Sequence, residues 1–182
     1  MKNAYYLAAL LAVLLFAGCG KEKTPGDEQA DTSLITHSPS DAYNWDAYNT
    51  PGYFGEVVFV PVYSSIFHQS DRTYDLTATL TVHNIDLTSP MKILSVDYYD
   101  TDGKLIRKFT GSEIELSPLQ SRQFIIKESD ISGGTAAKFV VQWVAGSEIA
   151  RPVIESVMIS TSSQQGISFK TESKVISSLG YK

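Results

Sequence analysis

The feature of this sequence that most constrains its fold is the strict alternation of apolar and polar residues in the segment 75–82. Four apolar side chains fall on one face of an extended chain, and three threonines fall on the other. A period of two residues is typical of a β-strand with one buried and one solvated face, as in antiparallel sheets. After residue 55, no segment shows the period of an amphipathic helix over three turns. We therefore predict an all-β fold in which these residues are buried: Leu76, Ala78, Leu80 and Val82.

Further apolar runs follow at intervals set by turn residues. The runs 92–99 and 104–109 flank a turn that ends in Gly103, which predicts a β-hairpin because glycine readily adopts the positive φ angle that such turns require. The run 57–63 contains Pro61, which lacks a backbone N–H, so we predict an edge strand or a strand with a bulge. Other strands are predicted at 123–127, 138–145, 153–160 and 166–170.

About eight short strands separated by turn residues favour a single antiparallel β-sandwich of the immunoglobulin or fibronectin type III kind. The chain has one cysteine, so the sandwich has no internal disulfide and must be stabilised by its core. We expect no cofactor and no metal, since a thiolate-rich site is excluded and the usual zinc-binding His spacings are absent. The predicted core between the sheets consists of Val60, Leu80, Val82, Val96, Phe124, Ile126, Phe139, Val141, Trp143, Val157 and Phe169.

The charge of the chain excludes one class of partner. The formal net charge is −5 at pH 7, and the basic residues form no block. Nucleic-acid binding normally needs a basic patch, because neutralisation of phosphates supplies much of the affinity. We therefore exclude nucleic acid as a partner.

The N-terminal residues 1–18 have the pattern of an export signal. Lys2 precedes the uncharged apolar run 5–16, which is shorter than the ~20 residues of a membrane-spanning helix. Two small residues follow, and then Cys19. This pattern resembles the lipobox of bacterial lipoproteins, which implies that Cys19 is acylated and becomes the new N-terminus; Phe16 departs from the aliphatic residue usual at its position. The alternative is an ordinary signal peptide cleaved nearby, with Cys19 unmodified.

The lipobox resemblance also implies a location. Two or three acyl chains would hold the protein on a membrane, whereas a single chain binds only reversibly. Gly20 stands where an Asp often marks lipoproteins retained in the inner membrane, so an outer-membrane protein facing the periplasm is implied if the cell has an outer membrane. We therefore expect a cell-envelope protein whose partner is the membrane, through the lipid anchor on Cys19. A further envelope partner, protein or polysaccharide, is left open.

The sequence divides into a signal peptide at 1–18, a lipidated cysteine with a flexible tether at 19–54, a β-sandwich at 55–177 and a C-terminal tail at 178–182. The stretch 21–29 has no aliphatic residue, and a segment of this composition cannot offset the entropy lost on ordering. Residues 41–48 carry three aromatic side chains. We favour their docking on the sandwich, because exposed aromatic clusters are unusual in a monomer; binding of a partner is the alternative.

Four stretches of the folded part are similar to a family of exported bacterial proteins, the domain of unknown function DUF3124. They are Val58–Ser64, Ser95–Asp100 with Gly103–Leu105, Asp130–Gly134 and Gly166–Phe169. The resemblance covers about residues 56–170. It implies export and a compact β domain, and it implies no activity and no site residue.

Two polar loops are the first choices for a ligand site, because hydroxyl and amide groups at the end of a sandwich can hydrogen-bond a sugar or a peptide. The residues predicted to bind a ligand are Ser129, Asp130, Ser132, Thr161, Ser162, Gln164 and Gln165. Asp97, Asp100 and Asp102 could contact Ca²⁺, but a hairpin turn uses the same residue types and the EF-hand spacing is absent, so we predict a turn.

We predict a lipid-anchored β-sandwich of the cell envelope that acts as a binding or structural module, with no catalytic residues. The alternative is a hydrolase of envelope polymers in which His68 and Asp71 act with a loop serine. The sequence has no Gly-x-Ser-x-Gly motif. A pocket in which His68, Asp71 and a serine meet would favour the hydrolase.

Overall fold

The computed structural model describes residues 43–161 and 166–181. The chain divides into two units, Met1–Thr36 and His37–Lys182, and the described residues all belong to the second. The predicted signal peptide and Cys19 therefore lie outside the described residues. The regular structure of the described part comprises η2 (Asp46–Tyr48), β1 (Phe54–Val62), β2 (Ser65–Gln69), β3 (Arg72–Asp75), β4 (Thr77–His83), β5 (Met91–Tyr99), β6 (Leu105–Lys108), β7 (Ile114–Leu116), β8 (Ser121–Ile126), η3 (Gly134–Ala136), β9 (Ala137–Ala145), β10 (Val153–Ser160), β11 (Ile167–Glu172) and β12 (Lys174–Leu179).

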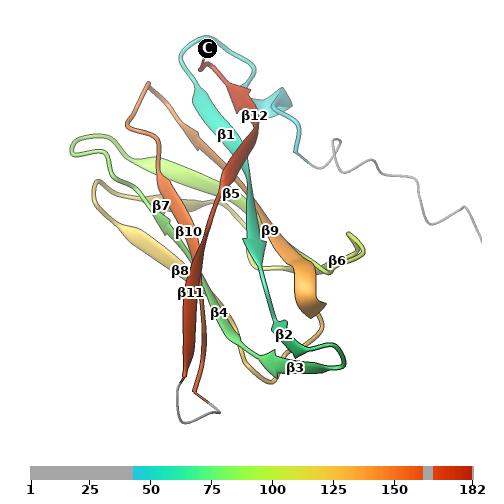
Figure 1. Ribbon diagram of the computed structural model, residues 1–182. Coiled ribbons are helices and arrows are strands. Elements are labelled where there is room, and N and C mark those ends of the chain that lie inside the picture. Colours follow the sequence, from blue (N-terminus) through green and yellow to red (C-terminus); the bar gives the residue numbers. More distant parts are fainter. Residues whose placement is uncertain (1–42, 162–165, 182) are drawn as a thin grey trace, which may run out of the picture. The chain divides into compact units, whose positions relative to one another are not determined.

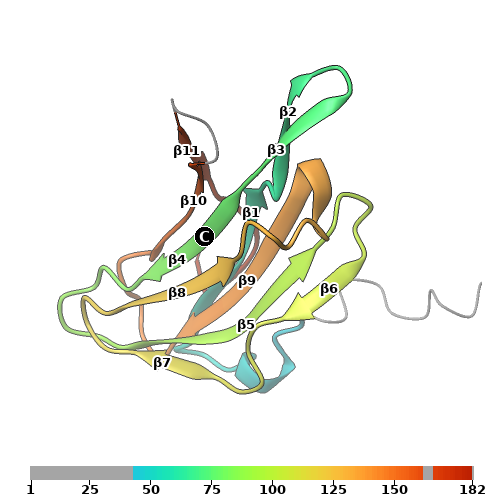
Figure 2. The same ribbon diagram turned by 90° about the horizontal axis from the view of Figure 1, so that it is seen from below.

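The strands form two main antiparallel sheets that face each other (Figures 1 and 2). The six-stranded sheet has the order β12-β1-β9-β5-β6, with β7 also paired to β5, and the four-stranded sheet has the order β11-β10-β4-β8. A separate hairpin, β2–β3, projects from one end of the sandwich. The predicted antiparallel sandwich is confirmed. The described part holds twelve strands rather than about eight, because β2, β3, β7 and β12 are short or largely exposed and carry no alternating apolar pattern.

The core lies between the two sheets. The four alternating apolar residues of segment 75–82 are all buried, as predicted, and Trp143, Tyr98 and Phe139 are the largest side chains that are fully enclosed. The prediction was wrong for Val157, which is half-buried on the outer face of β10. The small polar residue Ser156 takes the inward position instead, beside Met158.

Strand β1 is not an edge strand, because it pairs with β9 along its whole length and with β12 along its first part. The register of β1 with β9 is unbroken, and the shift in the pairing with β12, at the step between Val57 and Val58, has its extra residue on β12, so the bulge predicted for β1 from Pro61 is absent. Pro61 itself lies past the last residue that pairs with β12. Its carbonyl oxygen accepts a hydrogen bond of 2.6 Å from Thr171 Oγ1.

One continuous stretch of chain serves both sheets. β11 pairs with β10 in the four-stranded sheet, and β12, which follows after one residue, pairs with β1 in the six-stranded sheet. The stretch therefore closes one side of the sandwich (Figure 1). β12 includes residues 178 and 179, and Tyr181 beyond it packs on Phe54 with ring centroids 5.2 Å apart.

The β5–β6 hairpin has the expected turn. Gly103 has a φ angle of 84°, and Asp100 Oδ1 accepts a hydrogen bond of 2.8 Å from the Lys104 backbone N–H. The described residues contain no group of three or more His, Cys, Asp and Glu side chains that could hold a metal ion. They also contain no helix of the length and apolarity needed to cross a membrane.

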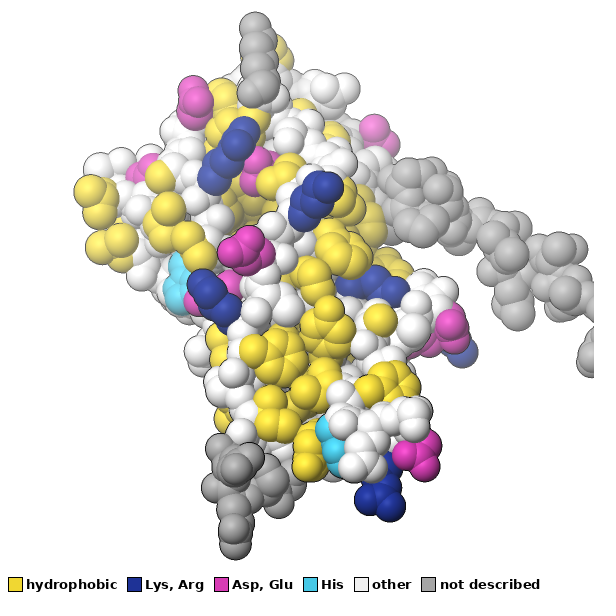
Figure 3. Space-filling view, in the orientation of Figure 1, with side chains coloured by type: hydrophobic (Ala, Val, Ile, Leu, Met, Phe, Trp, Pro, Cys, Tyr) yellow, Lys and Arg dark blue, Asp and Glu magenta, His cyan; other side chains and the backbone are white. Residues whose placement is uncertain are grey.

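Hydrophobic side chains gather on the surface between β11 and the β2–β3 hairpin (Figure 3). In this region the rings of Tyr63 and Phe169 lie 6.0 Å apart, and both pack partly against the core. The aromatic contact extends the core past the end of the β1–β12 pairing.

Candidate functional site

Residues 43–48, here called the strap, lie across the outer face of the six-stranded sheet. Tyr43 donates a hydrogen bond of 2.8 Å to Asp97 Oδ2 on β5, and Gln142 Nε2 on β9 donates one of 3.0 Å to the backbone oxygen of Asn44. Trp45 Nε1 donates a longer bond, 3.4 Å, to a β12 serine. The strap thus crosses the strands from β5 to β12. The aromatic segment is docked on the sandwich.

The strap is held at a second point by Tyr48. Its hydroxyl donates a hydrogen bond to Glu113, and the Lys92 ammonium lies 2.9 Å from the other oxygen of that carboxylate. These two hydrogen bonds, with Tyr48 as the larger contributor, lower the pKa of Glu113. The ring of Tyr48 also meets that of Tyr53 edge to face. Both strap tyrosines therefore end on a carboxylate, Tyr43 on one within β5 and Tyr48 on one directly before β7.

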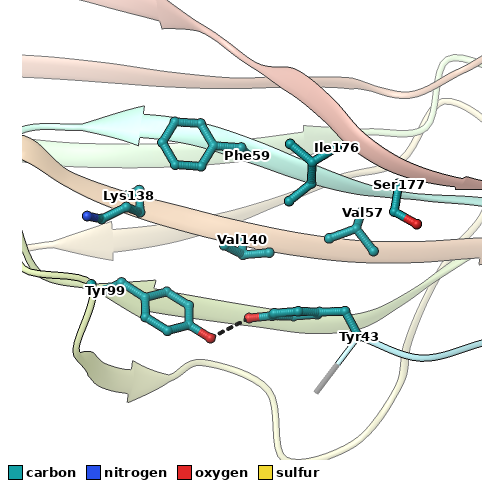
Figure 4. A pocket seen from close by; sticks show the side chains of 9 residues that line it. Tyr43, Val57, Phe59, Tyr99, Lys138, Val140, Ile176 and Ser177 are labelled. Atoms are coloured by element: carbon teal, nitrogen blue, oxygen red, sulfur yellow. Dashed lines mark hydrogen bonds between the residues drawn. The ribbon is translucent and has the colours of Figure 1, made fainter. Parts of the chain in front are cut away.

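A groove of about 420 Å³ lies beside the strap on the same face of the sheet (Figure 4). Its floor consists of Val57 and Phe59 from β1 and Val140 from β9. Apolar side chains are unusual on the solvent face of an antiparallel sheet, and here Val57 is only 1% exposed because the strap and β12 flank it. The volume is within the range of small-molecule sites.

The bulge in β12 builds one wall of the groove. Val57 pairs with Ser177 and Val58 with Val175, so Ile176 is the extra residue. Bulges re-aim side chains, and Ile176 and Ser177 both line the groove. Ile176 remains 57% exposed. The wall is therefore an aliphatic side chain held over an apolar floor.

The opposite wall consists of two phenols. The hydroxyls of Tyr43 and Tyr99 are 2.8 Å apart and are drawn joined in Figure 4. Burial is the first cause that raises the pKa of each phenol. At one end of the groove is Lys138, whose ammonium donates a hydrogen bond of 3.1 Å to the Thr101 carbonyl oxygen. The site is thus mainly apolar, with a short polar wall and one cation.

The predicted ligand loops lie elsewhere. Asp130 accepts a hydrogen bond from Ser132 Oγ and forms an ion pair of 2.6 Å with Arg107, so its carboxylate closes its own loop and ties it to β6. These contacts lower the pKa of Asp130, the Ser132 hydroxyl first. Ser129 lines a separate shallow pocket beside β3. Thr161 is exposed, while Ser162, Gln164 and Gln165 lie outside the described residues.

The hydrolase alternative gains no support from the positions of its residues. His68 lies on the β2–β3 hairpin, where its ring stacks on Tyr74 with centroids 4.2 Å apart. Asp71 lies exposed in the turn of the same hairpin. Neither residue lines the groove or the pocket beside β3.

Sequence reasoning missed the groove, although one signal for it was present. The tetrapeptide Asp-Ala-Tyr-Asn occurs twice, at 41–44 and 46–49. Each copy supplies a tyrosine that donates a hydrogen bond to a carboxylate. No comparable signal in the sequence marks the bulge at Ile176. The strand Lys174–Leu179 is exposed or half-exposed throughout, so it has no alternation of buried apolar residues in which a shift could be seen.

The fold and the groove define a class, an antiparallel β-sandwich with a lined apolar groove on the outer face of one sheet. The family model "Protein of unknown function (DUF3124)" matches residues 55–176, and the chain belongs to this family. A search of curated proteins and a search of solved structures found no match. The matched segment includes β1 except its first residue, all of β9 and the first half of β12, so it contains the floor of the groove and Ile176.

Proposed function

We propose that this protein is a lipid-anchored module of the bacterial cell envelope that binds a chain-like amphiphile in the groove and does not transform it. The observation that carries the proposal is the apolar floor of Val57, Phe59 and Val140, roofed on one side by Ile176. Burial of apolar surface is the main driving force for binding in such a site. An elongated apolar chain with a small polar end fits a groove whose polar groups lie only along one wall and at one end.

The anchor part of the proposal rests on Cys19. The apolar run before it and the small residues at 17 and 18 support cleavage at this point, and acylation would follow from the likeness to the lipobox. Cys19→Ala should leave the precursor unprocessed, with the larger mass of the uncleaved chain and no incorporation of labelled palmitate. Normal processing of Cys19→Ala, or a wild-type chain that incorporates no palmitate, would reject the anchor.

The groove is tested by titration with N-phenylnaphthylamine, a neutral probe whose fluorescence increases in apolar surroundings. The mature chain carrying Cys19→Ser avoids competition from its own acyl groups. We expect saturable binding, weakened roughly tenfold or more by Ile176→Glu, or ~1.4 kcal/mol, because a charge would enter the apolar groove. Ile176 is 57% exposed, so the substitution should leave the fold intact.

The matched control is Ile125→Glu. Ile125 is 53% exposed and lies on β8 in the other sheet, so the variant makes the same chemical change away from the groove. It should bind the probe as the wild type does. Equal losses in the two variants, or none in either, would reject the groove as the binding site.

A further inference from the structure

We propose that the groove selects amphiphiles whose polar end donates a hydrogen bond, such as an alcohol or an ammonium group, and discriminates against a carboxylate. This inference rests on the proposed function, since it names the ligand class of the same groove. It has two bases. The first is the proton order, meaning which group donates each hydrogen bond along the phenol wall, and the second is a buried carboxylate behind that wall.

The proton order follows from the capacity of each group. A phenol has one proton to donate, and an ionised carboxylate only accepts. Tyr43 donates its proton to Asp97 Oδ2 at 2.8 Å. The contact of 2.8 Å between the two phenols must then have Tyr99 as the donor and Tyr43 as the acceptor.

This order leaves the Tyr99 oxygen with free lone pairs and no free proton. Tyr99 lines the groove, so the polar wall offers a ligand an acceptor. Burial raises the pKa of both phenols, which keeps both protons in place at neutral pH. A ligand hydroxyl or ammonium can donate a hydrogen bond to the Tyr99 oxygen. A ligand carboxylate has no proton to donate, so it cannot form this hydrogen bond.

Asp97 strengthens the same preference. It is 2% exposed, and its Oδ1 has no hydrogen-bond partner among the described residues. The negative charge is therefore poorly compensated, and charges interact strongly where water is excluded. A ligand anion beside Tyr99 would be repelled, and a ligand cation attracted.

The one cation that lines the groove does not reverse this preference at the phenol wall. Lys138 is the cross-strand partner of Tyr99 at the end of the groove, but its side chain points out of the groove and away from the two hydroxyls (Figure 4). Its ammonium already donates to Thr101 O at 3.1 Å. A carboxylate bound to Lys138 would not contact Tyr99, so substitutions of Tyr43 or Tyr99 would not change its affinity.

The test is displacement of N-phenylnaphthylamine from the mature chain by decanol, decylammonium and decanoate, which share one alkyl length. The wild type should bind decanol and decylammonium at least about tenfold more tightly than decanoate at neutral pH. Tyr99→Phe removes the acceptor and should reduce this difference, leaving the part that comes from the Asp97 charge. Ile125→Glu, in the other sheet, should retain it.

Asp97→Asn provides the sharper variant. Its amide can donate to Tyr43, which allows Tyr43 to donate to Tyr99 and Tyr99 to donate to the ligand. Decanoate should then bind about as tightly as decanol. If Asp97→Asn does not fold, Tyr43→Phe releases the Tyr99 proton and should improve decanoate binding, though by less than Asp97→Asn because the Asp97 charge remains.

The two proposals fail in different ways. If the probe does not bind the wild type, both the groove function and the selectivity are rejected. If the probe binds and Ile176→Glu weakens it, but the three competitors are equal or decanoate is preferred, only the selectivity is rejected. An unchanged preference in Asp97→Asn and Tyr43→Phe would reject the proton order.

Discussion

Arg151 Nε lies 3.0 Å from Glu56 Oε1, which joins a side chain that is 53% exposed to one that is 3% exposed. The guanidinium also lies over the ring of Tyr181, 4.6 Å from its centroid. Tyr181 in turn donates a hydrogen bond of 3.1 Å to the backbone oxygen of Ile149. One arginine therefore compensates a buried carboxylate and holds the end of the chain against the sandwich.

Arg151→Ala should destabilise the fold, because it leaves the Glu56 carboxylate buried without its counter-charge. Loss of one partner from a fully buried pair costs about 3–5 kcal/mol, and since Arg151 is half exposed we expect ~1–3 kcal/mol in urea unfolding. Adding Glu56→Gln should recover most of the loss, since a neutral amide needs no counter-charge. Failure of this rescue would assign the effect to the Tyr181 contact.

Stability should also depend on pH through Glu56. Burial raises the pKa of Glu56 above 4.5, while the charge of Arg151 and the indole of Trp143 act in the opposite direction. The native state then binds the proton more tightly than the unfolded state, so this contribution favours folding at low pH and is lost as pH rises through the raised pKa. Arg151→Ala should therefore cost less at a pH below 4.5 than at neutral pH. Equal losses at the two pH values would contradict this assignment.

Asp86 should have the opposite pH dependence. Backbone N–H groups of Thr88, Ala150 and Ser89 lower its pKa from 3.8 to about 2. The native state releases this proton more readily, so the contribution is present above 3.8 and is lost as pH falls through about 2. Thermal unfolding over this range should show a smaller acid loss in Asp86→Asn than in the wild type. If the two proteins lose stability equally as the pH falls, these hydrogen bonds do not favour the ionised form of Asp86 over the protonated form.

Leu119 should be a site where glycine stabilises the fold. It has a φ angle of 62° in the turn closed by the 3.0 Å bond from Gln120 N to Ser117 O, and it is 66% exposed. A left-handed conformation costs a side-chain-bearing residue roughly 1–2 kcal/mol, and glycine avoids it at an entropic cost of about 0.4–1 kcal/mol. Leu119→Gly should raise the free energy of unfolding by up to ~1 kcal/mol. Leu119→Val should lower it, since β-branching worsens the strain; the reverse order would refute the argument.

The strap should contribute to stability, whereas the residues before it should not. Deletion of residues 20–42 removes none of the contacts between the strap and the sheet, so the melting temperature should change little. Deletion of 20–50 also removes the hydrogen bonds to Asp97, Glu113 and Gln142 and uncovers Val57. We expect a drop of several degrees, as ~1 kcal/mol corresponds to roughly 2–8 °C in domains of this size. Equal melting temperatures of the two deletions would show that the strap is only loosely held.

The sandwich was predictable because its central strands alternate. In segment 75–82 each inward position is apolar, so register and face could be read directly. β10 was harder, because Ser156 takes an inward position and Val157 an outward one, and β-branching alone does not distinguish the faces. Trp143 was placed in the core on its pattern, and it is fully buried.

The groove was not predictable, because it depends on contacts between distant segments. The pairing of Tyr43 with Asp97 spans 54 positions in the sequence, and the Asp-Ala-Tyr-Asn repeat around Tyr43 does not indicate which carboxylate the phenol meets. Sequence reasoning looked for ligands in polar loops, where hydroxyl groups are plentiful. In the loop that contains Asp130, the polar groups bond to each other and to Arg107.

The two walls of the groove come from opposite ends of the described chain, at Tyr43 and Ile176. A groove built in this way cannot exist on a partly synthesised chain, because its second wall forms only when β12 pairs with β1. Pairings between distant segments form slowly, since a long loop must close first. The groove is therefore complete only late in folding, once β12 has paired with β1, and a partly synthesised chain lacks one of its two walls.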